Sequence, residues 1–211
     1  AVYPSKHHGY SNRMTVRNFH RLLQYLLLFP LMVICLLYCS TSQEIASPIS
    51  TQLEIFQKVL SFNRTKTTNS GTLIIGIIYQ SKFRASLNVV NDIEQYFQEN
   101  EVKVSGKTVQ IQLIDLVNID LETAINQYGI TFAYIAPLRA YDVSTIHKLL
   151  FPRKILTLTG VPAYCENNDV AVAIGASAGK PQIILNRKSY MEEGADFSAQ
   201  LLKLKFIRII E

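Results

Sequence analysis

The residues most typical of catalysis fall in one short segment, Gly175 to Gly179. It reads G-A-S-A-G and matches the G-x-S-x-G turn in which hydrolases present a nucleophilic serine. That turn joins a strand to a helix, whereas the apolar run Gln182–Leu185 indicates that a second strand follows here. The one histidine between residues 43 and 211, His147, precedes Ser177, although hydrolases of this fold place it after the serine. A serine hydrolase using Ser177 is therefore our second alternative function.

Phosphate and metal chemistry each lack a necessary residue. The segment Gly175–Pro181 has nearly the spacing of a phosphate-binding loop, but Pro181 stands where that loop needs a hydroxyl for magnesium. The other histidines lie at positions 7, 8 and 20, and no later segment pairs His, Cys and carboxylates at ligand spacing. Cys165, alone in residues 43–211, has no disulfide partner there. We predict no enzyme activity, no metal site and no cofactor.

Side chains suited to recognition follow the apolar runs that we interpret as parallel strands. In open α/β sheets, ligands meet the loops at the carboxyl ends of the strands. Arginine and tyrosine are favoured in recognition surfaces, and both types are frequent in these loops. The structural alternative is that these residues pack over the sheet edge. The candidate partner- or ligand-binding residues are Tyr79, Gln80, Arg84, Arg139, Tyr141 and Tyr164.

The elements that would position these loops are arranged around Thr72–Gln80, which reads T-L-I-I-G-I-I-Y-Q. Its apolar run does not alternate, which is typical of a strand buried on both faces at the centre of a parallel sheet. Further strands are predicted at 109–113, 130–136 and 155–161, and helices at 48–62, 85–98, 121–128 and 142–150. This alternation predicts right-handed crossovers and a mostly parallel, doubly wound sheet, as in Rossmann or flavodoxin-like folds.

The pattern changes after residue 170. Two apolar runs, 170–174 and 182–185, are too close together for a crossover helix and therefore predict an antiparallel hairpin. A short helical piece near 188–193 and a C-terminal helix at 198–210 are predicted to follow, the latter capped by Asp196 or Ser198. The predicted fold is a single α/β domain whose sheet ends in this hairpin and the C-terminal helix.

The positive charge belongs mostly to the first 42 residues. The chain carries a net charge of +5, and four of its 21 basic residues but none of its 16 acidic residues lie in this segment. Residues 43–211 are therefore almost neutral, with 17 basic and 16 acidic residues. Because nucleic-acid binding needs a basic footprint, we predict no nucleic-acid partner.

Residues 14–42 are typical of an export leader. Arg17 and Arg21 precede an apolar run at 22–38, and the small residues Ser40 and Ser42 follow it, so we expect cleavage after Ser42. An uncleaved membrane anchor is the alternative, and lipidation of Cys39 is a third interpretation. Residues 1–13 precede Met14 and are interpreted as non-native. We expect residues 43–211 to form the folded domain and to lie in the periplasm, either free or anchored through residues 22–38.

Six blocks of sequence, in order, resemble the YfiR family of bacterial periplasmic proteins. They span about residues 50–210, and the last block is the most specific. The blocks are Leu60–Arg64, Tyr79–Ser86, Ala136–Arg139, Leu156–Pro162, Lys180–Asn186 and Glu193–Leu204. The resemblance implies an exported, often dimeric, non-enzymatic α/β domain. Its best-known member represses an inner-membrane diguanylate cyclase by binding the periplasmic sensor domain, which controls cyclic di-GMP and biofilm formation.

Three functions are therefore expected in order. The leading one is a periplasmic regulator that binds and modulates an inner-membrane signalling protein, by resemblance a diguanylate cyclase or a sensor kinase, with a homodimer as a second expected association. The paired, redox-sensitive cysteines of that best-known member are missing here, because Cys165 is alone in residues 43–211. The alternative is a periplasmic small-solute binding protein. The length of the chain argues against it, because transport-type binding proteins close two lobes around a ligand. The serine hydrolase comes last.

Overall fold

The computed structural model describes residues 45, 47–65, 71–139, 141–167 and 169–211. The chain divides into two compact units, residues 1–42 and 43–211, and only the second contains described residues. The predicted upstream segment, leader, cleavage site and Cys39 lie outside the described residues. Within the described part, no helix combines the length and the apolar character needed to cross a membrane.

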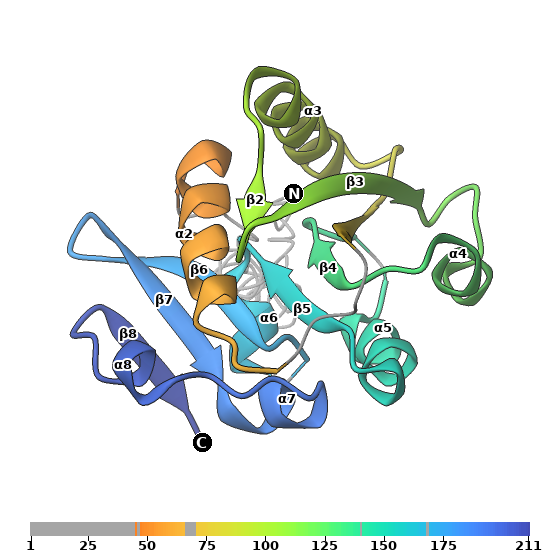
Figure 1. Cartoon of the computed structure of the whole chain (residues 1–211). Coiled ribbons are helices and arrows are strands. Elements are labelled where there is room, and N and C mark those ends of the chain that lie inside the picture. The colour runs from red at the N-terminus through yellow and green to blue at the C-terminus, as the bar shows by residue number, and fades with distance from the viewer. Residues whose placement is uncertain (1–44, 46, 66–70, 140, 168) are drawn as a thin grey trace, which may run out of the picture. The chain divides into compact units, whose positions relative to one another are not determined.

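The described residues form one eight-stranded sheet in the order β2-β3-β1-β4-β5-β6-β7-β8 (Figure 1). Five neighbouring strands, β3, β1, β4, β5 and β6, are parallel. They are β3 Lys107–Asp115, β1 Thr72–Tyr79, β4 Phe132–Ile135, β5 Leu156–Thr159 and β6 Val172–Ser177. The short β2, Lys103–Val104, is antiparallel to β3 at one edge. The central position predicted for the strand Thr72–Gln80 is confirmed.

Helices cover both faces of the sheet, which makes the fold doubly wound, as predicted. On one face, α2 (Ile49–Ser61) and α3 (Arg84–Glu99) share a core cluster with Leu73 and Ile77 of β1. On the other face, α4 (Leu121–Tyr128) and α5 (Val143–Leu150) share a second cluster with Ile78. Successive β1 side chains thus point to opposite faces, as the two-residue period of a strand requires.

Local sequence signals set the ends of these helices. Asp120 accepts a hydrogen bond from the Thr123 backbone N–H, and Asp142 accepts one from that of Ser144, so both begin their helices as N-caps. Gly129 ends α4 with φ 61°, a left-handed conformation that glycine adopts without steric cost. The predictions at Asp142 and Gly129 are confirmed.

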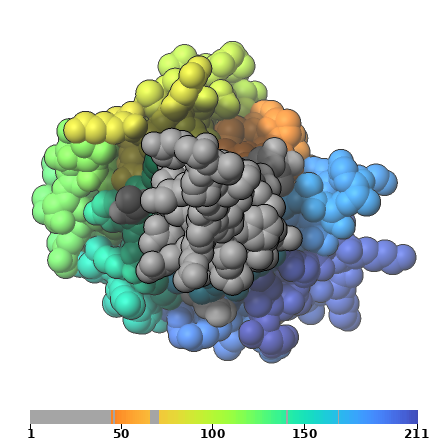
Figure 2. Space-filling model, turned by 180° about the vertical axis from the view of Figure 1, so that it is seen from behind, coloured from red at the N-terminus to blue at the C-terminus, as the bar shows by residue number. Residues whose placement is uncertain are grey.

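The predicted hairpin is also confirmed. β6 pairs antiparallel with β7 (Lys180–Asn186) through a turn at Ala178 and Gly179, whose φ angles are 50° and 73°. Two left-handed residues in succession are typical of tight hairpin turns. The turn projects at the side of the domain in both views (Figure 1, Figure 2). Because a strand follows Ser177, the strand–turn–helix elbow of a hydrolase is not formed.

The predicted C-terminal helix at 198–210 is wrong beyond its first turn. A short helix α8, Ala199–Leu202, follows Ser198, whose Oγ caps the Leu201 N–H. The chain then turns and forms β8, Ile207–Ile210, parallel to β7. β8 consists of three isoleucines and Arg208, and β-branched residues lose less side-chain entropy in a strand than in a helix. Pairing with β7 therefore outweighs the helical spacing of the apolar residues.

Candidate functional site

The loops after β1 and β4 meet at the carboxyl end of the parallel strands. β1 lies between β3 and β4, so the strand order reverses there, and open α/β sheets bind ligands at such a point. The side-chain Oε1 of Gln80 accepts a hydrogen bond from the Arg139 backbone N–H at 2.7 Å. The Gln80 N–H in turn donates to Ser86 Oγ at 3.0 Å. The structure thus brings Gln80 and Arg139 together.

The predicted tyrosines of this edge have different environments. Tyr164, in α6 (Pro162–Glu166), is 7% exposed, and its hydroxyl accepts the Leu138 backbone N–H at 2.8 Å. Burial raises the pKa of Tyr164, so the hydroxyl remains a neutral hydrogen-bonding group that supports the Leu138 backbone. Tyr79 is half-buried, while Tyr141 is 39% exposed. Tyr164 therefore fits the packing alternative better than a recognition role.

The predicted Arg84 and Arg139 are both exposed. Among the described residues, neither forms an ion pair. The sequence analysis missed Asp115, at the end of β3, whose buried carboxylate accepts the Ser81 and Val117 backbone N–H groups at 3.0 and 3.1 Å. Burial raises the pKa of Asp115, but these and other hydrogen bonds outweigh it and lower the pKa overall. Asp115 organises the loop after β1.

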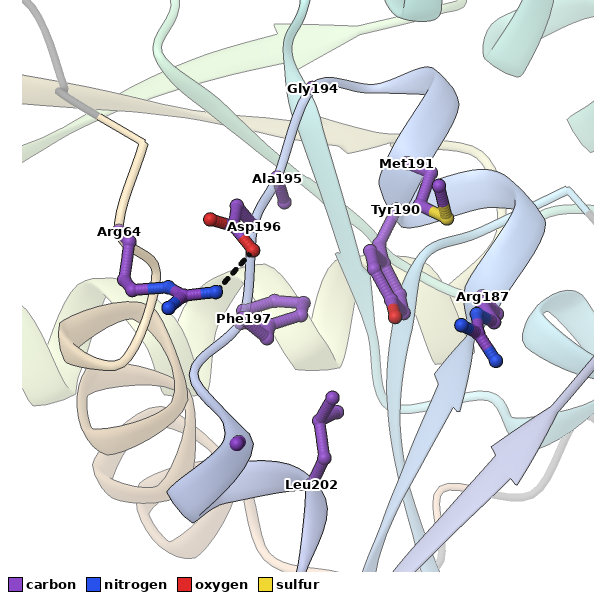
Figure 3. A pocket seen from close by; sticks show the side chains of 10 residues that line it. Arg64, Arg187, Tyr190, Met191, Gly194, Ala195, Asp196, Phe197 and Leu202 are labelled. Atoms are coloured by element: carbon purple, nitrogen blue, oxygen red, sulfur yellow. Dashed lines mark hydrogen bonds and ion pairs between the residues drawn. The ribbon is translucent and has the colours of Figure 1, made fainter.

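A second site lies at the opposite edge of the sheet, where the sequence analysis proposed nothing. It is a cavity of about 510 Å³, within the usual range for small-molecule sites, and we call it the α7–α8 pocket (Figure 3). Its walls come from α7 (Arg187–Glu192), the following segment and α8. The residues that line it are Arg64, Arg187, Tyr190, Met191, Gly194, Ala195, Asp196, Phe197, Ala199 and Leu202.

The inner wall of the α7–α8 pocket is apolar and aromatic. The rings of Tyr190 and Phe197 meet edge to face with centroids 5.1 Å apart, and both residues are buried. Ala195 is also buried, and Leu202 is half-buried. Backbone hydrogen bonds hold this wall, with the Ala195 N–H donating to the Tyr190 carbonyl at 2.8 Å. Such a wall suits an aromatic or aliphatic group.

Two arginines stand at the rim of the pocket, each in an exposed ion pair. Arg64 lies 2.9 Å from Asp196, and Arg187 lies 3.1 Å from Glu211. All four side chains are more than half exposed, and exposed ion pairs are worth only about 0–1 kcal/mol. An incoming anion can therefore replace either carboxylate at little cost.

The Tyr190 hydroxyl is the most informative polar group of the pocket. Tyr190 is only 6% exposed, yet within the described residues its hydroxyl has no hydrogen-bond partner. No fully buried side-chain polar atom in this part of the chain lacks a partner, so this oxygen reaches open space. In Figure 3 its ring lies between Phe197 and Arg187, which places the free hydroxyl in the pocket. A ligand can hydrogen-bond there.

Sequence reasoning missed this site because it predicted one continuous helix from Ser198 to Ile210. The signal that could have revealed the site was the hairpin. Because β7 runs opposite to β6, its carboxyl end lies at the edge where the parallel strands begin. Arg187 comes directly after β7, and Glu211 directly after β8. The rule that ligands meet strand carboxyl ends therefore also applies at this edge.

The described residues contain no cluster of three or more His, Cys, Asp or Glu side chains that could hold a metal ion. Cys165 is buried with its Sγ 3.6 Å from the Ile184 carbonyl oxygen, and burial raises its pKa to about 12. The thiol is therefore protonated and unreactive at neutral pH.

Comparison with known proteins identifies structural neighbours only. No protein-family model matches the chain, and no curated protein matches it. One solved structure with a similar fold is an ABC domain in complex with L-Trp from Streptococcus pneumoniae, at TM-score 0.51 and 14% identity. Another is the ligand-free, open form of a substrate-binding protein with adhesive properties from Clostridium difficile, at TM-score 0.51 and 15% identity. The matches cover 77% and 78% of this chain but only 60% of each neighbour.

Proposed function

We propose that residues 43–211 form an exported, non-catalytic binding domain whose ligand occupies the α7–α8 pocket. The ligand class that fits is a small amphipathic organic anion, with an apolar or aromatic group and a carboxylate. The apolar group would lie against Tyr190, Phe197 and Leu202, while the anion would take Arg187 or Arg64 from its present carboxylate. The free hydroxyl of the buried Tyr190 is the observation that carries this proposal.

The structural neighbours support the small-solute function over the regulator that the sequence analysis placed first. The names of both neighbours describe ligand or substrate binding. The present chain spans 60% of their length, so a complete two-lobed arrangement is not part of the proposal.

Regulation of a membrane signalling protein is the second candidate function. Its support is the position of the sequence block Glu193–Leu204, the most specific part of the resemblance to the YfiR family. Six of the ten residues that line the α7–α8 pocket come from this block. In this candidate, an occupied pocket would change the affinity of the domain for a cyclase or sensor kinase. Cys165 is buried and forms no disulfide within the described residues, so they offer no disulfide through which such a regulator could respond to redox state.

Isothermal titration calorimetry of the purified full chain tests the binding proposal. The panel contains aromatic amino acids, branched-chain keto acids, medium-chain fatty acids and the dye anilinonaphthalene sulfonate. We expect saturable binding by at least one compound. Arg187→Gln should weaken it about tenfold or more through the lost charged hydrogen bond, and Tyr190→Phe about two- to tenfold.

The matched control is Arg153→Gln. Arg153 also forms a partly exposed ion pair, with Glu122 at 2.9 Å, but it does not line the α7–α8 pocket. The control should bind like the parent chain. Equal weakening in all three variants, or no saturable binding anywhere in the panel, would show that the pocket is not the ligand site.

A further inference from the structure

A buried cluster of ionisable residues lies next to the α7–α8 pocket. The Nδ1 atom of His147 lies 3.2 Å from Oε1 of Glu193, and its Nε2 atom lies 3.4 Å from Oε2 of Glu192. His147 is 8% exposed and Glu193 only 1% exposed. The Thr157 N–H and hydroxyl of β5 both donate to Glu193, each at 2.7 Å. The Ala171 N–H donates to Thr157 Oγ1 at 2.9 Å, which is the fifth polar contact of the cluster.

The geometry of this cluster fits a protonated His147. An ionised carboxylate only accepts hydrogen bonds, whereas a neutral imidazole has one donor and one acceptor nitrogen. Both ring nitrogens of His147 face carboxylate oxygens, so a neutral ring would oppose one acceptor to another. Only the imidazolium donates to Glu192 and Glu193 at once. Loss of the proton therefore turns one of the two contacts from attractive to repulsive.

The cluster is covalently continuous with the pocket wall. Glu193 ends α7 and reaches toward α5 and β5, while Ala195 and Phe197 belong to the core cluster on the other face of the sheet. The segment Gly194–Phe197, which follows Glu193 directly, lines the α7–α8 pocket. Glu192 and Tyr190 belong to the same short helix, so a shift of the Glu192 carboxylate bears on the pocket from that side too.

We propose that the protonation of His147 controls the position of the segment Gly194–Phe197 and thereby the ligand affinity of the α7–α8 pocket. The protonated state holds the end of α7 through both carboxylates and keeps the pocket in its present shape. The neutral state releases the partly exposed Glu192 and loosens the wall. This inference rests on the proposed function, since it describes the regulation of the same pocket.

The charged groups around His147 favour its protonated form. The hydrogen bond to Glu193 raises the pKa of His147, burial opposes this, and Glu192 adds to the rise. Burial raises the pKa of Glu193, against the hydrogen bonds from His147 and Thr157. Charged groups also surround the cluster from other directions: Asp169 lies before β6, Lys148 and Asp142 lie on or beside α5, and the Nζ of Lys154 donates to the Glu192 carbonyl at 2.8 Å. Phe151 stacks on the His147 ring with centroids 5.2 Å apart.

The sign of the effect on stability follows from these directions. A pKa of His147 that is higher in the folded than in the unfolded state stabilises the fold below about pH 6.5. The stabilisation is lost as the pH rises through the folded-state pKa. The raised pKa of Glu193 acts in the same sense. Protonation of His147 therefore makes the cluster tighter on the acid side of its folded-state pKa, as long as Glu193 stays ionised.

The test follows the His147 ring and the backbone amides of Gly194–Phe197 by NMR in the full chain, from about pH 5 to about pH 8.5, where histidine titrates. We expect one midpoint above 6.5 for the ring and the same midpoint for these amides. His147→Gln assigns the ring signals and should abolish the amide transition. Lys148→Gln, which removes an exposed charge from the adjacent residue of α5, should keep it. Glu192→Gln should lower the midpoint and serves if His147→Gln does not fold.

A parallel titration with anilinonaphthalene sulfonate measures the pocket. We expect about fivefold tighter binding at the acid end than at the basic end, within the usual range of coupling between sites, and no such difference in His147→Gln. Amides that stay fixed while the ring titrates would overturn the inference, as would a ring that is neutral throughout. Amide shifts without dye binding at any pH would support the His147 control but refute the proposed ligand class. Dye binding that does not depend on pH, together with fixed amides, would support the proposed ligand class but refute the control by His147.

Discussion

Gly160→Ala is the substitution whose cost the structure defines most closely. Gly160 follows β5, and a Cβ added there would lie 2.7 Å from Nε2 and 2.9 Å from Cδ of Gln52. Gln52 cannot turn aside cheaply, because it is fully buried in α2 and bonded at both ends of its amide. Its Nε2 donates to the Ser47 carbonyl at 2.7 Å, and its Oε1 accepts from the Tyr134 hydroxyl at 3.0 Å. The new methyl group would displace the amide from both partners.

The expected loss follows from those two hydrogen bonds. Each of the two broken bonds leaves a buried group without a partner at a cost of about 1–3 kcal/mol, so Gly160→Ala should lower the free energy of unfolding by about 2–6 kcal/mol. Equilibrium unfolding in urea measures it, with Gly71→Ala as the control because nothing lies within 4 Å of its added Cβ. If the clash with Gln52 is the cause, Gly160→Ala combined with Gln52→Ala should lose no more than Gln52→Ala alone. A loss below about 0.5 kcal/mol in Gly160→Ala would refute the reasoning.

Three further outcomes are expected. Gly194→Ala forces a side chain into φ +80°, so it should cost about 1–2 kcal/mol in urea unfolding and weaken ligand binding. Native Cys165 should resist iodoacetamide at neutral pH and react after unfolding, as peptide mass spectrometry can follow; ready reaction of the native thiol would contradict its raised pKa. Tyr164→Phe should lose about 1–3 kcal/mol because the Leu138 N–H is left unpaired, whereas Tyr141→Phe, at an exposed site, should lose less than about 0.5 kcal/mol.

The parallel half of the sheet could be predicted because its signals are local. The unbroken apolar run of β1 and the caps at Asp142 and Gly129 each specify one element, and the structure forms all three. The β6–β7 hairpin was predictable because the spacing of its strands leaves no room for a crossover helix. These features need no knowledge of distant contacts.

The C-terminal strand could not be predicted because its conformation depends on a distant partner. The spacing of Leu201, Leu204 and Ile207 is helical, yet Ile207 and Ile209 pair in register with Ile183 and Leu185 of β7. That pairing is invisible in a local window of sequence. The same limitation hid Asp115, which ends the half-exposed strand β3 and shows its role only when the loop after β1 folds over it. Tyr164 is of a residue type common in recognition surfaces, but its ring is buried and its hydroxyl binds the Leu138 backbone N–H.

The two candidate edges differ in what their polar groups already do. At the carboxyl end of the parallel strands, the polar groups of Gln80, Asp115 and Tyr164 already accept hydrogen bonds from the backbone of neighbouring loops. A ligand there would have to break those bonds or bind to exposed guanidinium groups alone. At the carboxyl ends of β7 and β8, the hydroxyl of the buried Tyr190 has no hydrogen-bond partner among the described residues, and Arg187 pairs with an exposed carboxylate. A ligand can use hydrogen-bonding groups that are still free in an apolar wall. We therefore propose that the edge formed by the carboxyl ends of β7 and β8 is the better binding edge.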